Sequence, residues 1–199
     1  MTTLRAYWFF GDRLRDSRPI PPDGEWLEQS GDLALCENGL HASEHPFDAL
    51  RYAPGNNLAL VEVSGTIVHG DDKLCASRRR IIARFDATEL LCAFARRQAL
   101  SVIHLWKAPA VVREYLETGD ETLRNGARAN AADANAAAAY AANAAAAYAA
   151  NAYAANANAA CAAANAACAA AYAAAYAAAR KQFREVVEAK FAEILKEAQ

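Results

Sequence analysis

The apolar positions of residues 1–84 recur in short runs that are typical of strands. Leu4–Phe10 is an aromatic-rich run that predicts a strand, and Leu33–Cys36 is a shorter strand candidate. Leu58–Val63 and Thr66–His69 alternate apolar and mixed positions on either side of a Ser-Gly pair. This pattern predicts either two strands or one strand with a bulge. The first part of the chain is therefore expected to be mainly β.

Arg78–Phe85 is a further strand candidate because isoleucine and phenylalanine are mixed with three consecutive arginines. The arginines favour an edge or surface strand with a basic exposed side. Alternation along a strand would send Arg78 and Arg80 to one face and Arg79 to the other. A phosphate or an acidic partner is one use for such a triplet, but a solvated or salt-bridged face is the simpler expectation.

Helical spacing takes over in the next part of the chain. A short helix is expected from Pro46 to Arg51, since proline suits the first turn. Asp86 and Glu89 have the spacing of a capping box and predict the start of another helix. Ala99–Leu105 is a candidate for a second helix in this region, and Pro109 is expected to open a third. These helices would close the N-terminal module.

The second half of the chain is dominated by alanine. Residues 134–179 include 33 alanines among 46 positions, and the others are only Asn, Tyr and Cys. Alanine has the highest helix propensity, and neither Gly nor Pro follows Arg128, so a helix of up to about 70 residues is allowed. A turn at Asn156–Asn158 would instead give a helical hairpin. Helices covered with methyl groups can approach closely, which predicts self-association or a hairpin.

One face of this expected helix carries the larger side chains, and a 100° helical wheel places them in one stripe. The stripe consists of Asn158, Cys161, Asn165, Cys168, Tyr172, Tyr176, Phe183 and Val187. Arg180–Gln199 is an ordinary amphipathic helix that could cap or dock the assembly. The sequence thus predicts an α+β fold in which a mainly-β module closed by short helices (residues 1–125) precedes an alanine-rich helical tract (126–179) and an amphipathic C-terminal helix (180–199).

Charge and composition exclude several classes of protein. The formal net charge is −2, and residues 1–128 hold 16 basic against 18 acidic side chains, which argues against a nucleic-acid partner. The N-terminus lacks the features of a signal peptide, and the alanine tract is too weakly apolar to favour a membrane helix. Five scattered cysteines do not form a disulfide framework, so a cytoplasmic location is expected.

Metal-ligating residues are sparse. Cys36, His41, His45 and His69 include the ligand types that zinc prefers, but their spacing matches no known structural zinc site. Histidines that are hydrogen-bonded within loops are the simpler expectation. Neither a metal nor a cofactor is predicted.

Four short motifs resemble an uncharacterised domain family that is common in phage and bacterial genomes. They are Cys36–His41, Pro46–Leu50 with Tyr52, Val61–Gly65 and Gly70–Lys73. The likeness covers roughly residues 4–90. In that family the module often precedes low-complexity repeats, as it does here. The resemblance implies an accessory protein of a phage or bacterium and names no reaction.

A looser likeness is to ADP-ribosyltransferase folds. Its residues occur in similar order: Arg5, then Gly39, Leu40 and Ser43, then Ala49, Tyr52 and Ala53, then the Val61–Val63 strand. The likeness implies that the arginine holds a dinucleotide and that the serine segment lines a nicotinamide pocket. Those enzymes also need a glutamate on a late strand, and no Glu-x-Glu or Gln-x-Glu lies between Val63 and Phe85. The likeness therefore favours a nucleotide-like pocket without the reaction.

The sequence predicts a non-catalytic binding or assembly protein, with a ligand-binding head and a helical tail that sets spacing or oligomeric state. The candidate ligand-binding residues are Arg5, Gly39, His41, Ser43 and Tyr52. Two alternatives stay open. One is an NAD-binding enzyme of the ADP-ribosyltransferase type. The other is an ice-binding alanine helix, although such helices usually repeat threonine every 11 residues.

Overall fold

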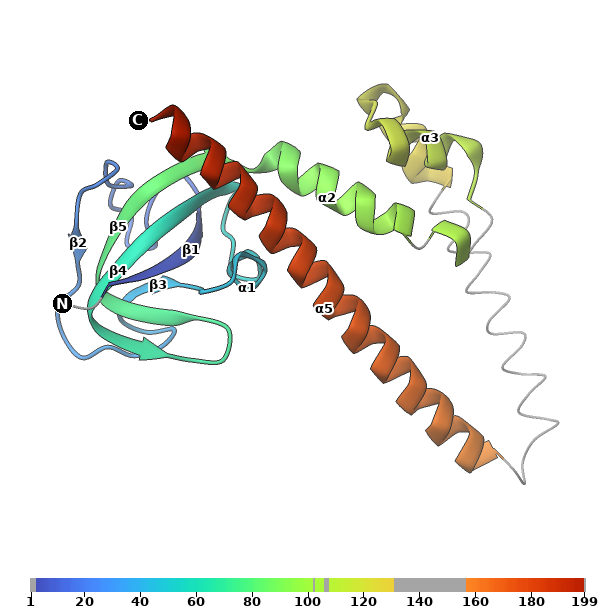
Figure 1. Ribbon diagram of the computed structural model, residues 1–199, viewed down its shortest axis with the longest axis horizontal. Coiled ribbons are helices and arrows are strands. Elements are labelled where there is room, and N and C mark those ends of the chain that lie inside the picture. The colour runs from blue at the N-terminus through green and yellow to red at the C-terminus, as the bar shows by residue number, and fades with distance from the viewer. Residues whose placement is uncertain (1–2, 102, 106–107, 131–156, 199) are drawn as a thin grey trace. The chain divides into compact units, whose positions relative to one another are not determined.

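The computed structural model describes residues 3–101, 103–105, 108–130 and 157–198 (Figure 1). The chain forms two compact units. One contains residues 1–90 together with residues 180–199, and the other contains residues 91–179. The composition instead predicts a boundary near residue 125. The C-terminal segment thus belongs to the same unit as the N-terminal module.

An antiparallel sheet forms the centre of the first unit. Its strands are β1 (Leu4–Phe10), β2 (Leu27–Glu28), β3 (Leu40–Ala42), β4 (Asn57–His69) and β5 (Leu74–Asp86). The order is β1-β4-β5-β2, and β3 also pairs with β5. Together with the helices this sheet makes the fold α+β, as the sequence predicts.

The bulged-strand interpretation of β4 is confirmed. One strand runs through the Ser-Gly pair, and its register against β5 shifts between Leu60 and Val61 and again between Ser64 and Ile67. Gly65 adopts φ +79°, which glycine tolerates far better than other residues. The second shift therefore occurs where the sequence contains its most permissive residue.

The prediction that Arg78–Phe85 lies at an edge is wrong. These residues belong to β5, which pairs with β4 on one side and with β2 and β3 on the other. Arg79 is 5% exposed, and its guanidinium lies 3.6 Å from the centroid of the Trp8 ring. An aromatic face and a backbone acceptor allow this arginine to be buried, which the local sequence does not show.

The remaining two arginines of the triplet confirm the expected salt-bridged face. Arg78 pairs with Glu28 at 2.9 Å, and Arg80 pairs with Glu62 at 2.5 Å. Both guanidiniums also lie over the ring of Trp26, at 4.7 and 4.8 Å from its centroid.

The strand predicted at Leu33–Cys36 is wrong. Residues 35–37 form a tight turn that is closed by the pairing of Ala34 with Asn38, and Cys36 adopts φ +72°. A short apolar run is not sufficient for a strand when the chain turns back within four residues.

Three helices begin close to their predicted starts: α1 (Pro46–Leu50), α2 (Thr88–Ser101) and α3 (Ala110–Thr118). The described residues also include α5 (Ala157–Glu197) and short 3-10 helices at Ile103–Leu105 and Glu121–Leu123. Asp86 accepts a hydrogen bond from the backbone N–H of Thr88 at the start of α2. A separate helix at Ala99–Leu105 is wrong, because α2 itself continues to Ser101.

The C-terminal part of α5 completes the core of the first unit. Phe183, Val187 and Phe191 are buried there. The Phe191 ring lies 6.2 Å from the ring of Tyr7 on β1 and 5.2 Å from that of Phe85 on β5. The amphipathic helix predicted for residues 180–199 therefore covers one face of the sheet.

The opposite face of the sheet holds a second apolar cluster. Its buried members are Ala6, Phe10, Ala42, Ala59, Val61, Val63, Leu74, Ala76 and Ile81. Leu4, Trp8, Ile20 and Ile67 are partly buried against it. The sheet therefore carries buried apolar side chains on both faces.

Several predictions lie outside the described residues. They concern residues 131–156 of the tract 126–179, Asn156 of the proposed hairpin turn, and the side chains of Asn158, Cys161, Asn165, Cys168 and Tyr172. In the part of the chain that the structure describes, no helix combines the length and the apolar character needed to cross a membrane.

Candidate functional site

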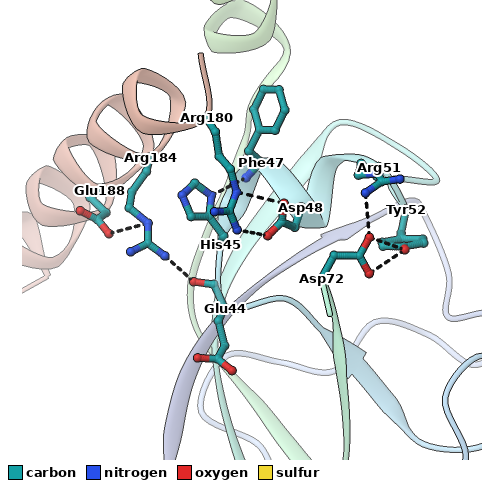
Figure 2. Close-up of polar contacts among 10 residues, drawn as sticks. All are labelled: Glu44, His45, Phe47, Asp48, Arg51, Tyr52, Asp72, Arg180, Arg184 and Glu188. Carbon is teal, nitrogen blue, oxygen red and sulfur yellow. Dashed lines mark hydrogen bonds and ion pairs between the residues drawn. The ribbon is translucent and has the colours of Figure 1, made fainter. Parts of the chain in front are cut away.

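Polar contacts fix the C-terminal helix to the start of α1. The carboxylate of Asp48, which is 6% exposed, accepts hydrogen bonds from the Arg180 guanidinium, with Nε to Oδ1 at 3.2 Å (Figure 2). Arg184 donates to the backbone carbonyl of Glu44 at 2.8 Å. His45 caps α1 by accepting from the N–H of Phe47 at 3.3 Å. These bonds hold residues 44–48 against α5.

A cleft of about 410 Å³ lies where β1 meets α5. Its lining residues come from the sheet, from the loop before α1 and from the last turns of α5. They are Arg5, Tyr7, Glu44, Leu60, Arg184, Glu188, Phe191, Ala192 and Leu195. The volume falls within the roughly 300–1,000 Å³ range of small-molecule sites.

The charges in this cleft are unevenly paired. Glu188 lies 3.7 Å from Arg184 and accepts a hydrogen bond from the Tyr7 hydroxyl at 3.3 Å. Burial, and secondly the Glu188 carboxylate, raise the pKa of Tyr7 to about 12, so its hydroxyl stays protonated at neutral pH. Arg5 is exposed, and no carboxylate of the described residues lies within ion-pair distance of its guanidinium. The cleft therefore places Arg5, which makes no ion pair with a described carboxylate, beside a neutral donor.

A second group of polar side chains, the Lys73 cluster, consists of Cys36, His41, Arg51, Tyr52, Asp72 and Lys73. The Lys73 ammonium lies 2.9 Å from the Cys36 sulfur and 4.2 Å from the centroid of the Tyr52 ring. The Tyr52 hydroxyl donates to the Asp72 carboxylate at 2.8 Å, and Arg51 pairs with that carboxylate at 2.9 Å (Figure 2). This cluster joins three of the four motifs that the sequence analysis singled out.

The candidate ligand-binding residues are not gathered in one pocket. Arg5 lines the cleft, whereas His41 and Tyr52 belong to the Lys73 cluster. Ser43 is buried, and its backbone exchanges hydrogen bonds with Tyr7 at 2.7 and 2.9 Å. Gly39 has φ +132°, and a Cβ atom there would approach Cys75 Cβ to 2.9 Å, so its role is close packing.

The cleft residues on α5 were missed by the sequence analysis. Arg184 and Glu188 lie some 180 positions after Arg5 and Tyr7 along the chain. The amphipathic pattern of residues 180–199 predicts a docking helix, but it does not say which surface the helix covers. No local signal links the two sides of the cleft.

The four zinc candidates do not converge. Within the described residues, no group of three or more His, Cys, Asp or Glu side chains is placed to hold a metal ion. His41 accepts from the N–H of Cys36 at 2.9 Å, and His69 lies 3.1 Å from Glu44. Burial, as the main cause, lowers the pKa of His41. These histidines are hydrogen-bonded, as the simpler expectation has it, but His41 and His69 lie in strands β3 and β4 and not in loops.

Comparison with known proteins reaches the N-terminal module only. Residues 4–93 match a family model described as a domain of unknown function (DUF7666). This stretch contains all five strands, α1 and the first turns of α2. It also agrees with the resemblance to an uncharacterised domain family over roughly residues 4–90. No curated protein and no solved structure matches the chain.

Proposed function

We propose that this protein is a non-catalytic binding protein whose N-terminal module takes a small anionic ligand in the cleft between β1 and α5. The observation that carries this proposal is Arg5. Arg5 lines the cleft, and no carboxylate of the described residues lies within ion-pair distance of its guanidinium. A free arginine beside a concave surface is suited to a carboxylate or phosphate, which it can bind through two parallel hydrogen bonds.

The remaining lining favours an amphipathic anion of nucleotide type. Apolar surface for a flat aromatic part of the ligand comes from Leu60, Phe191 and Leu195. Glu44 and Glu188 provide carboxylates that accept hydrogen bonds from hydroxyl groups, such as those of a ribose. A ligand with a phosphate at one end and a flat nucleobase at the other would match this arrangement of charged and apolar side chains.

Ligand binding can be tested by thermal unfolding of the full chain with AMP, ADP-ribose, NAD and inorganic phosphate. A ligand at 100 times its dissociation constant stabilises the folded state by about 2.7 kcal/mol, which gives a measurable rise in Tm. Arg5→Ala should abolish the rise, whereas Arg113→Ala, an exposed substitution on α3, should leave it intact. If none of the four compounds raises Tm, the proposal is wrong.

An assay of nicotinamide release distinguishes the enzyme alternative. An ADP-ribosyltransferase-like protein would release nicotinamide from NAD, and Arg5→Ala would stop the release. Binding of NAD without nicotinamide release would support the non-catalytic function.

We further propose that the alanine-rich tract of residues 126–179 sets spacing or drives self-association. The support is its composition, since surfaces of methyl groups favour close packing with another helix. Light scattering of the full chain over a range of concentrations tests this. Self-association predicts a mass of at least twice the 21.3 kDa of one chain. A mass of one chain at every concentration would contradict self-association. The remaining explanations would then be a spacer or a helical hairpin.

A further inference from the structure

One wall of the cleft consists of the last turns of α5. Residues 180–198, called the clasp segment from here on, supply more than half of the lining residues: Arg184, Glu188, Phe191, Ala192 and Leu195. The same segment places Phe183, Val187 and Phe191 in the core of the first unit. Without the clasp segment, the residues on the sheet side of the cleft would lie on an open surface.

Side-chain contacts attach the clasp segment to the rest of the first unit. Arg180 pairs with Asp48, and Arg184 donates to the backbone carbonyl of Glu44 at 2.8 Å (Figure 2). The strands β4 and β5, in contrast, are joined by a ladder of backbone hydrogen bonds. A helix satisfies its own backbone groups, so the clasp segment can leave the sheet while the backbone hydrogen bonds of both elements stay intact.

The path of the chain permits this movement. The sheet lies within residues 1–90, the clasp segment begins at residue 180, and residues 91–179 between them belong to the second unit. The clasp segment is therefore not tied to the sheet by a short loop, and its position depends on the contacts that it makes. Opening of one such element costs less free energy than unfolding of the whole unit.

A ligand in the cleft contacts both walls. Arg5 and Leu60 lie on the sheet side, whereas Phe191 and the half-buried Leu195 lie on the clasp segment. A ligand that bridges the two walls binds only when the clasp segment is docked. Binding and docking therefore favour each other by the same factor, as thermodynamic linkage requires.

We propose that the clasp segment opens while the sheet stays folded, and that a ligand in the cleft holds it closed. This inference rests on the proposed function, because the ligand is the one proposed for the cleft. Ligand occupancy then controls whether the end of α5 is fixed on the N-terminal module. The binding site is in this way coupled to the helix that follows the alanine-rich tract.

Thiol labelling of two full-chain variants tests the opening. Val187→Cys introduces a thiol beneath the clasp segment, and Val61→Cys is the matched control within β4, since both valines are fully buried. N-ethylmaleimide is added at neutral pH, and peptide mass spectrometry gives the labelling rate at each introduced thiol. Exposed Cys92 gives the rate of an accessible thiol in each variant. We expect position 187 to be labelled at least ~10-fold faster than position 61, which becomes accessible only when the sheet opens.

The same labelling with AMP, ADP-ribose or NAD tests the effect of the ligand. A compound at 100 times its dissociation constant should slow the labelling at position 187 by about 100-fold, because only the docked state binds it. Labelling of Cys92 should not change. Val187 does not line the cleft, so a slower rate at this position reports docking and not direct cover by the ligand.

Two results would overturn the proposal. Equal rates at positions 187 and 61 without ligand would show that the helix leaves the sheet only when the whole unit unfolds. A rise in Tm without slower labelling at position 187 would show that the cleft binds the compound and that only the clasp is wrong. If none of the three compounds raises Tm or slows the labelling, the nucleotide-type ligand is wrong as well.

Trypsin cleavage of the unaltered protein repeats the comparison without a substitution, in case a variant does not fold. Cleavage after Arg184 in the clasp segment should precede cleavage after Arg79, which is buried in β5. The three compounds should delay the first cleavage. Simultaneous cleavage at the two sites would contradict a separate opening of the clasp segment.

Discussion

At the scale of single residues, buried charge in this protein is balanced by aromatic rings and backbone oxygens as well as by carboxylates. Arg79 donates to the carbonyl of His41 at 2.5 Å and stacks on Trp8, and burial lowers its pKa to about 9. Asp48, in contrast, is balanced by Arg180. The middle arginine of the basic triplet is therefore part of the core. Alternation along residues 78–80 predicts that Arg79 faces the other side of the strand, but it does not predict that Arg79 is buried.

His45 gives a pH dependence of stability. Burial, followed by the charges of Arg184 and Arg180, lowers the pKa of His45 from 6.5 to about 4 in the folded protein. Between pH 6.5 and 4 the unfolded chain binds this proton more readily, so stability is full above pH 6.5 and falls as the pH drops through that window. His45 is 9% exposed, and we expect a loss on the order of 1–2 kcal/mol.

Urea unfolding of the unaltered protein and of His45→Asn between pH 5 and 7.5 measures this effect. Asparagine can still cap α1, but it does not titrate. The variant should therefore show a flatter stability profile than the unaltered protein. Parallel profiles would mean that His45 does not carry the pH dependence.

At the scale of elements, the sequence predicts whether a segment is a helix or a strand better than it predicts which segments lie next to it. The starts of α2 and α3 follow from local capping and proline signals, and the bulge in β4 follows from its Ser-Gly pair. The central place of β5 does not follow, because its partners Trp8 and Trp26 lie more than fifty residues away. Local pattern determines an element, whereas pairing between distant segments determines whether it is an edge or a centre.

Gly65→Ala tests the β4 bulge. Gly65 has φ +79°, where an added Cβ is strained, and that Cβ would lie 2.2 Å from the Ser77 hydroxyl oxygen. The same oxygen accepts a hydrogen bond from the N–H of Thr66 at 3.0 Å, so moving it away costs that bond. We expect a loss of about 2 kcal/mol or more from the left-handed backbone and the displaced hydroxyl together.

Gly126→Ala is the matched control. Gly126 lies in a helical stretch at residues 124–130, and a Cβ there would meet only Val111 at an ordinary 3.6 Å. Alanine should stabilise that helix by roughly 0.5–1 kcal/mol. Urea unfolding of both variants should give changes of opposite sign in the free energy of unfolding. Equal losses would show that the bulge does not require glycine.

At the scale of the whole molecule, the chain returns to its N-terminal module after residues 91–179. The composition of residues 180–199 predicts an amphipathic helix, but nothing local shows that its apolar face covers the sheet. The cleft depends on this return, since Arg184, Glu188 and Phe191 form one of its walls. The candidate site therefore could not be assembled from the sequence of either segment alone.

Phe183→Ala tests how much the first unit depends on this helix. Phe183 is fully buried, and its ring meets that of Phe47 edge to face at 5.7 Å. Truncation of such a residue typically costs 3–5 kcal/mol, and we expect a loss of that size in urea unfolding. Lys181→Ala, two positions earlier on α5 with a side chain that is 79% exposed, should change stability by less than about 0.5 kcal/mol. If both substitutions cost equally little, α5 is not part of the cooperative core. The cleft, which needs the helix in place, would then be a property of only part of the folded population.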